Sequence, residues 1–90
     1  MATEFCIYQV EENVDVNFLP WDNRFKYSIV IYTERHPSSE FYDLRDALYE
    51  KNKGGDDFVE ILPEDYILLQ AYVDLSKYEK QGHKFVCCII

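Results

Sequence analysis

The sequence predicts a single α+β domain, in which a small and mainly antiparallel sheet carries about two helices on one face. Three observations support this prediction. The chain has 90 residues, 48% of them are hydrophobic and 17% are aromatic, and apolar residues alternate in some segments but recur at helical spacing in others. Ninety residues is the usual length of one domain, and aromatic side chains supply much of the buried area of a small core. We therefore expect one domain over residues 1–90, with elements in the order β-β-α-β-α-β.

Four segments are predicted as strands because aromatic and β-branched residues dominate them, namely 4–10, 25–33, 58–62 and 83–90. Residues 11–17 form an acidic connection or a short strand, and residues 20–23 are typical of a turn. Within 25–33, apolar residues alternate with Lys26 and Ser28. One face of this strand is therefore expected to be apolar, formed by Phe25, Tyr27, Ile29 and Ile31.

Two further segments are predicted as helices. The first begins near the N-cap candidates of residues 37–39 and ends at Asn52 and Gly54-Gly55. The second opens at Pro63, which suits the first helical position, and runs to about Lys80 before Gly82. On the first helix, one side is expected to face the core, formed by Phe41, Leu44, Ala47 and Leu48.

Three cysteines favour a reducing, cytoplasmic compartment over a disulfide framework, because their number is odd and Cys87 and Cys88 are adjacent. We interpret all three, Cys6 included, as buried and unreactive thiols. The last four residues formally satisfy the prenylation motif C-a-a-X. A core strand over 85–90 fits them better, since no polybasic segment precedes the motif. No apolar run approaches the length of a membrane span and no signal-peptide pattern occurs, so we expect no membrane partner.

Catalysis finds little support in the sequence. The only histidines, His36 and His83, lie in no recognised nucleophile or metal-binding motif. A zinc site of these histidines with Cys6 and Cys87 lacks the close paired spacing of zinc ligands, and the acids after Gly54-Gly55 lack the ligand spacing of an EF-hand. We therefore predict that the protein is not an enzyme and needs no cofactor or metal.

Charge is the most distinctive feature of the chain. The chain contains seventeen Asp and Glu residues and nine Lys and Arg residues, which gives a net charge of −8. Neither residues 1–23 nor residues 54–76 contain a Lys or Arg. Such a chain repels nucleic acid and attracts basic protein surfaces. On the first predicted helix, at about 100° per residue, the acids form a stripe opposite the apolar side, namely Glu40, Asp43, Asp46 and Glu50.

These four carboxylates are spaced by roughly 4.5–6 Å along the helix axis, whereas one strand of B-DNA carries a charge about every 3.4 Å. Acids from residues 56–65, or from a second subunit, would bring the density closer to that of DNA. The acids expected to imitate phosphates are Glu11, Glu12, Asp15, Asp22, Glu40, Asp43, Asp46, Glu50, Asp56, Asp57, Glu60, Glu64, Asp65 and Asp74.

The chain resembles the Arn-like anti-restriction proteins of T-even bacteriophages in its length, its acidity and the segments FLPWDNRF, EFYDLRDALYEKNKGGDDFVEILPEDY and GHKFVCCII. The resemblance covers nearly the whole chain. It implies a homodimeric DNA mimic that protects phage DNA from an McrBC-type restriction nuclease, with the histone-like nucleoid protein H-NS as a further partner and no direct binding of nucleic acid. Because it contains nine Lys and Arg residues, this chain has a less negative charge balance than the most acidic DNA mimics.

One other interpretation of the acids stays open. An acidic stripe on the exposed face of a helix often serves only solubility. The protein would then be an adaptor or an antitoxin-like module that binds its partner through an aromatic surface or a sheet edge. Salt dependence separates these interpretations, because only DNA mimicry relies on charge.

Overall fold

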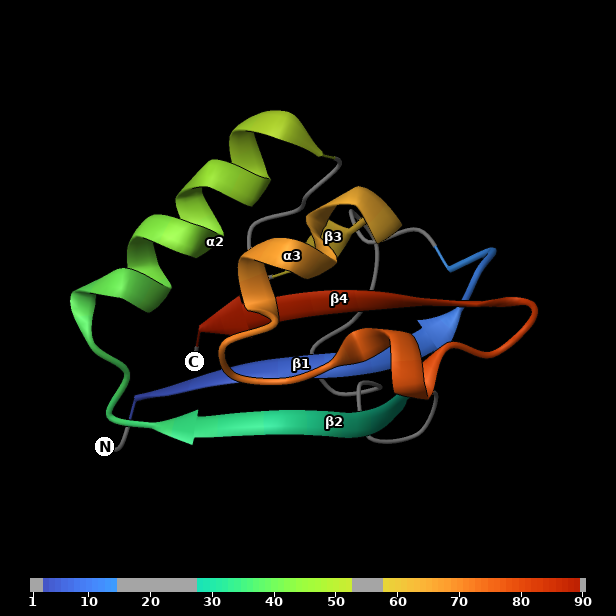
Figure 1. Ribbon diagram of the computed structural model, residues 1–90, viewed down its shortest axis with the longest axis horizontal. Helices are drawn as coiled ribbons and strands as arrows, with labels where there is room; N and C mark the ends of the chain where they lie inside the picture. Colours follow the sequence, from blue (N-terminus) through green and yellow to red (C-terminus); the bar gives the residue numbers. More distant parts are fainter. Residues whose placement is uncertain (1–2, 15–27, 53–57, 90) are drawn as a thin grey trace.

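The computed structural model describes residues 3–14, 28–52 and 58–89, and its centre is a four-stranded antiparallel sheet (Figure 1). The strands are β1 (Glu4–Glu11), β2 (Ser28–Arg35), β3 (Val59–Ile61) and β4 (His83–Ile89), in the spatial order β2-β1-β4-β3. The helix α2 (Ser39–Lys51) follows β2, and the shorter helices η2 (Pro63–Asp65), α3 (Tyr66–Leu69) and η3 (Leu75–Tyr78) lie between β3 and β4. The predicted α+β class and the order β-β-α-β-α-β are confirmed.

The two central strands are the first and the last along the chain. β1 and β4 pair over nearly their whole length, from Phe5 opposite Ile89 to Glu11 opposite His83. Pairing between residues so distant in sequence means that the sheet forms only when both ends of the chain are in place. Strands buried on both faces become nearly continuous hydrophobic runs, and the described parts of β1 and β4 have this character.

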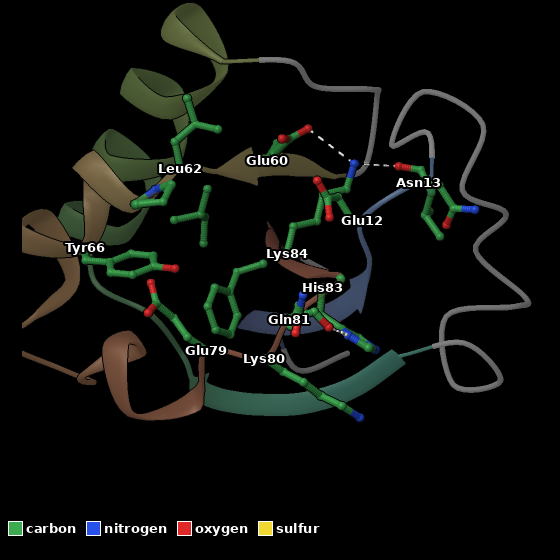
Figure 2. A pocket seen from close by; sticks show the side chains of 15 residues that line it. Glu12, Asn13, Glu60, Leu62, Tyr66, Glu79, Lys80, Gln81, His83 and Lys84 are labelled. Atoms are coloured by element: carbon green, nitrogen blue, oxygen red, sulfur yellow. Dashed lines mark hydrogen bonds and ion pairs between the residues drawn. The ribbon is translucent and has the colours of Figure 1, made fainter.

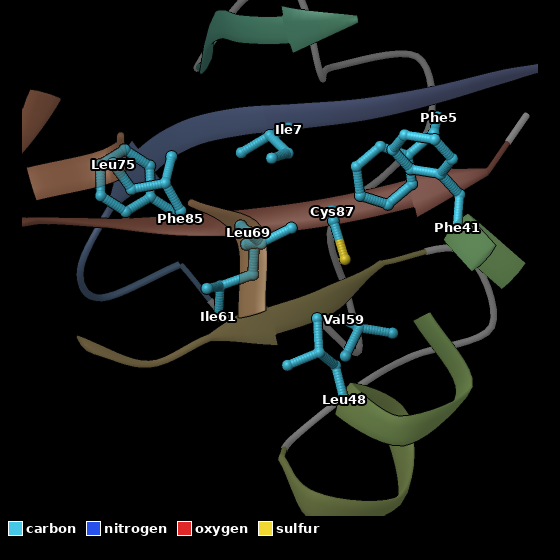
Figure 3. Packing of buried hydrophobic residues seen from close by; sticks show 10 residues of the cluster. All are labelled: Phe5, Ile7, Phe41, Leu48, Val59, Ile61, Leu69, Leu75, Phe85 and Cys87. Atoms are coloured by element: carbon cyan, nitrogen blue, oxygen red, sulfur yellow. The ribbon is translucent and has the colours of Figure 1, made fainter. Parts of the chain in front are cut away.

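The core on the helix side of the sheet is built by alternate residues of the strands and by one side of α2, α3 and η3 (Figure 3). Its buried members are Phe5, Ile7, Phe41, Leu48, Val59, Ile61, Leu69, Leu75, Phe85 and Cys87. The rings of Phe5 and Phe41 lie 5.0 Å apart and join the start of β1 to α2. The prediction that the helices share one face of the sheet is confirmed.

A second buried cluster lies on the opposite face of the sheet. It consists of Cys6, Tyr8, Val10, Phe58, Val86 and Cys88, with the partly buried Val14 packed against it. These residues alternate along β1 and β4 with those of the first cluster, as the two-residue period of a strand requires. The sheet is therefore apolar on both faces, although the helices of the described segments cover only one.

The first predicted helix agrees with α2 in its extent. Ser38 stands at the N-cap position without a side-chain hydrogen bond, and Asn52 stands at the C-cap with its backbone N–H bonded to the Leu48 carbonyl. The predicted stop at Asn52 is confirmed. The prediction that Ala47 faces the core is wrong, because Ala47 is exposed and the half-buried Arg45 lies at the other border of the apolar side.

The second predicted helix is shorter than expected. Instead of one helix from Pro63 to about Lys80, the chain forms η2, α3 and η3, separated by turns. Leu69 and Leu75 explain the break, since both are completely buried. In a continuous helix, residues six apart point in directions that differ by about 120°, so an interrupted helix is what brings both into the same core.

The edge strand β2 is more exposed than its sequence predicted. Ile29, expected on an apolar face, is 58% exposed, and the neighbouring Val30 is 46% exposed. Both lie opposite the end of β1, beyond a register shift between Ile7 and Tyr8. The expectations for residues 15–17, 20–23, 25–27 and Gly54-Gly55 lie outside the described residues.

Replacing Leu48 with Ala tests the packing of α2 on the sheet. Leu48 is 1% exposed, so the truncation leaves a cavity and should lower the free energy of unfolding by about 2–5 kcal/mol. Leu68→Ala is a matched control, because Leu68 is 49% exposed, and its effect should stay within about 0.5 kcal/mol. Urea unfolding measures both. Equal losses in the two variants would contradict this packing.

Candidate acidic protein-binding surface

The four acids predicted on the first helix form an exposed row on α2, which we call the α2 acidic stripe, namely Glu40, Asp43, Asp46 and Glu50. Phe41 and Leu48 on the opposite side are buried, so the predicted division of this helix into an acidic and a core side is confirmed for these residues. The stripe extends over about 15 Å of helix axis at 1.5 Å per residue. Its position at the outer side of α2 leaves the carboxylates open to a partner.

Both ends of α2 are held by side-chain contacts to the segment that follows β3. At the first turn, the Tyr72 hydroxyl donates a 2.8 Å hydrogen bond to Glu40 Oε2. At the last turn, Lys51 Nζ lies 2.7 Å from Asp65 Oδ1 and 3.3 Å from Glu64 Oε1. These contacts restrain rotation of the helix about its axis, and with it the direction in which the α2 acidic stripe points.

Asp65 is the centre of the contact at the last turn. Its carboxylate accepts hydrogen bonds from Lys51 Nζ, from Asn52 Nδ2 at 2.7 Å and from the backbone N–H of Leu62 at 3.0 Å. Asn52 also donates to the carbonyl of Glu60 in β3. Because Asp65 is 1% exposed, the prediction that it imitates a phosphate is corrected. It is a buried structural residue that joins α2, β3 and η2.

The pKa of Asp65 reflects this environment. Burial raises the pKa of the carboxyl, but the hydrogen bonds from Lys51, Asn52 and the Leu62 N–H outweigh burial and hold the pKa below its usual value. The pKa of the partner Lys51 is raised, chiefly by its hydrogen bond to Asp65. Both groups therefore stay charged at neutral pH.

The bases of the described segments neutralise several acids outside the centre of the stripe. Arg35 pairs with Glu4 and Lys84 with Glu60. Glu60 is only half-buried in β3 and is engaged by Lys84, so it does not extend the exposed acidic surface as expected. Such pairs remove acids from a surface that would mimic DNA.

Within the stripe, only Asp46 has an ion pair among the described residues, with Arg45 Nη2 at 3.0 Å. This base lies half-buried at the side of the helix and belongs to the same turn. Asp43 and Glu50 form no hydrogen bond or ion pair with any residue in the described part of the chain. The stripe therefore keeps most of its negative charge.

The other predicted acids do not join the α2 acidic stripe in one surface. Glu11 and Glu12 lie at the end of the sheet where β4 begins, whereas α2 starts after Arg35 at the opposite end. Asp74 is exposed and caps η3 by accepting from the Ser76 N–H at 3.2 Å. Glu64 is exposed and contacts Lys51 at the last turn of α2. Four predicted acids lie outside the described residues, namely Asp15, Asp22, Asp56 and Asp57.

Two tyrosines beside the stripe were not singled out from the sequence. Tyr42 and Tyr49 are 39% and 52% exposed on α2, and their spacing of seven residues puts them on one side of the helix, next to Asp46. That spacing is visible in the sequence, but exposure is not. Aromatic rings next to acids suit a partner surface rich in Arg.

A hollow of about 950 Å³ lies at the end of the sheet where β4 begins (Figure 2). Its walls carry acids and bases together, and Lys84 Nζ donates a 2.6 Å hydrogen bond to the Val14 carbonyl. Burial and a hydrogen bond to Glu79 raise the pKa of Tyr66, on another wall, to about 12. The described residues that line the hollow include no Ser, Thr or Cys, so none of these nucleophiles faces it.

The zinc site considered from the sequence is not assembled. Cys6 and Cys87 belong to clusters on opposite faces of the sheet, and among the described residues no group of three or more His, Cys, Asp or Glu side chains converges on one point. Cys87 of the prenylation motif is completely buried in β4. No helix within the described ranges is long and apolar enough to span a membrane.

Together, the fold and this surface define a small acidic α+β protein with a carboxylate row on its exposed helix. Comparison with protein-family models found no match, and comparisons with curated proteins and with solved structures found no significant match.

Replacing Asp65 with Asn tests the network that fixes α2. The variant should lose about 1–3 kcal/mol of unfolding free energy at pH 7, because buried donors lose their charged acceptor. The neighbouring Glu64→Gln is the matched control, and this exposed acid should cost less than about 1 kcal/mol. Urea unfolding of both variants measures the difference.

The same variant has a defined pH dependence. The pKa of Asp65 is lower in the folded protein than in the unfolded chain, so its stabilisation is complete above the unfolded value of about 3.9 and is lost as the pH falls through the lower, folded value. The gap between the wild type and Asp65→Asn should therefore be full near pH 7 and should close in acid. A gap that widens below pH 4 would contradict the assignment.

Proposed function

We propose that the protein is a DNA-mimic inhibitor that occupies the basic DNA-binding surface of a host protein, without chemistry of its own. The partner is a restriction nuclease of the McrBC type or a histone-like nucleoid protein, and the result is protection of phage DNA in the cytoplasm of the host cell. The observation that carries the proposal is the α2 acidic stripe. Its acids are exposed, and they lie on a helix that is held in place at both ends.

Electrostatics support a protein partner with a basic surface. A net charge of −8 on 90 residues repels nucleic acid and attracts positively charged proteins. Asp43 and Glu50 have no ion pair among the described residues, so a partner's Lys or Arg needs to displace no internal base to reach them. The nearby rings of Tyr42 and Tyr49 offer contact area for Arg side chains.

We also propose that the protein acts as a homodimer. One stripe of four acids over about 15 Å is sparser than the charges along a DNA strand, which repeat about every 3.4 Å. Two copies side by side would double the number of acids that a DNA-binding groove meets. The resemblance to the Arn-like anti-restriction proteins supports both the dimer and the choice of partner.

A triple variant that removes charge but not shape tests the role of the stripe. Glu40→Gln, Asp43→Asn and Glu50→Gln together should weaken binding to a McrBC-type nuclease about tenfold or more, because three charge contacts of about 0.5 kcal/mol each reach the 1.4 kcal/mol of a tenfold change. The affinity of the wild type should also fall steeply with salt, and less steeply for the variant. Titration of nuclease binding and of DNA cleavage at several salt concentrations provides the measurement.

The matched control removes three acids elsewhere, by Glu4→Gln, Glu34→Gln and Glu79→Gln. Both variants change the net charge equally, and Gln keeps a carbonyl acceptor for the side chains that contact these positions. The control should retain inhibition within about threefold if position matters more than net charge. Equal weakening by the two variants, or a wild-type affinity that does not change with salt, would refute inhibition through the stripe.

The exposed edge of β2 favours a second candidate, an adaptor or antitoxin-like module. Ile29 and Val30 are exposed on a strand that pairs, among the described strands, only with β1. An exposed edge can accept a strand from another protein. In this case Ile29→Lys would abolish binding, the charge variants would not, and the affinity would be insensitive to salt.

A further inference from the structure

The antiparallel pairing of the central strands brings two cysteines together that are 82 positions apart in the sequence. Cys6 of β1 lies directly opposite Cys88 of β4. Both belong to the buried cluster on the face away from the helices, and their side chains are joined by a hydrogen bond. The sequence suggested three unrelated buried thiols, whereas the structure makes two of them neighbours.

The spacing of this pair suits a disulfide bond. Residues directly opposite in an antiparallel ladder have Cα atoms about 4.5 or 5.5 Å apart, depending on the type of pair. Disulfides join Cα atoms at about 4.4–6.8 Å, so either type of pair lies within this range. Both side chains point to the same face of the sheet, and the strands need not move apart for the two sulfur atoms to bond.

Cys6 is also an activated thiol. The hydrogen bond with Cys88 lowers the pKa of Cys6, burial and Glu4 oppose this, and hydrogen bonds with Tyr8 and Thr33 add to it, with a resulting value of about 6. The Thr33 hydroxyl donates to Cys6 Sγ at 3.9 Å from the neighbouring strand, and Thr33 itself is exposed. A thiolate is the form that attacks oxidants.

Cys87 provides the contrast within the same strand. It points to the other face of the sheet, into the cluster beneath the helices, and is completely buried. Burial raises its pKa to about 12. Cys87 and Cys88 are adjacent in sequence and share the same strand, but only Cys88 faces another thiol.

We infer that Cys6 and Cys88 form an oxidisable dithiol site, which a peroxide converts into a disulfide linking β1 to β4. The Cys6 thiolate attacks one peroxide oxygen, the O–O bond breaks, and the released hydroxide takes up a proton to leave as water. The Cys88 sulfur then attacks the resulting sulfenic acid of Cys6, forms the S–S bond and releases the second water. Two thiols are oxidised and one hydrogen peroxide is reduced to two waters.

Single-cysteine replacements allow a direct test with hydrogen peroxide. Cys87→Ala retains the proposed pair, whereas Cys88→Ala retains Cys6 and Cys87 on opposite faces. After peroxide treatment and alkylation in denaturant, monomeric Cys87→Ala should lose the mass of two hydrogen atoms and accept no alkyl group until dithiothreitol is added. Cys88→Ala should form no intramolecular disulfide. A Cys87→Ala protein that keeps both thiols, or that links only between molecules, would overturn the inference.

Differential labelling of the wild-type protein gives the same answer without a variant. Trypsin releases residues 85–90 as one peptide that contains Cys87 and Cys88, so the two positions must be distinguished by fragmentation. Thiols that remain after oxidation are blocked with a first alkylating reagent, and those released by dithiothreitol are then blocked with a second. The expected pattern is the first label on Cys87 and the second on Cys6 and Cys88. The second label on Cys87 would reject the pairing.

Discussion

The position of the helix layer depends on one buried carboxylate. Asp65 accepts hydrogen bonds from Lys51 and Asn52 at the end of α2 and from the backbone N–H of Leu62 after β3. Three elements therefore meet at a single side chain that is 1% exposed. A buried charge is tolerated only where it is paired and hydrogen-bonded, so the geometry of these elements is constrained together. The orientation of α2, and with it the direction of the α2 acidic stripe, follows from that constraint.

This arrangement divides the acids into two groups with different roles. Asp65 and Glu60 are engaged by Lys51 and Lys84 and serve the fold. Asp43 and Glu50 have no ion pair among the described residues, and each lies three or four residues from Asp46 on the same helix face. Like charges on one helix face disfavour the folded state slightly. A partner that supplies the missing positive charge would relieve this cost on binding, which is why the stripe supports our proposal better than net charge alone.

Much of the fold was predictable from local patterns. The four strands and α2 could be recognised because strands and helices differ in the spacing of their apolar residues, and this spacing can be read from neighbouring positions in the sequence. The second helix was predicted too long, since its interruption depends on burying both Leu69 and Leu75 in a core that only the folded sheet defines. The edge position of β2 was likewise invisible, because a strand's neighbours depend on topology.

The candidate site was predictable only in part for the same reason. Helical periodicity placed the four acids of the stripe correctly, because it depends only on neighbouring residues. Asp65 follows Glu64 directly and has a similar side chain, but one is buried and the other exposed. The sequence cannot show which of two neighbouring acids is buried. In the structure, Asp65 is distinguished by its hydrogen bonds from Lys51 and Asn52, which come from another part of the chain.

Cys87 and Cys88 show how far a single strand can separate the chemistry of adjacent residues. The alternation of side chains across β4 directs one thiol under the helices and the other to the opposite face. The pairing of β4 with β1 then gives Cys88 a thiol neighbour in Cys6, which no local pattern predicts. β1 and β4 are the first and last of the described strands, so their pairing joins residues that are far apart in sequence. A disulfide between Cys6 and Cys88 would link these two strands covalently. The same pairing that organises the core thus creates the one place where two of its cysteines can react with each other.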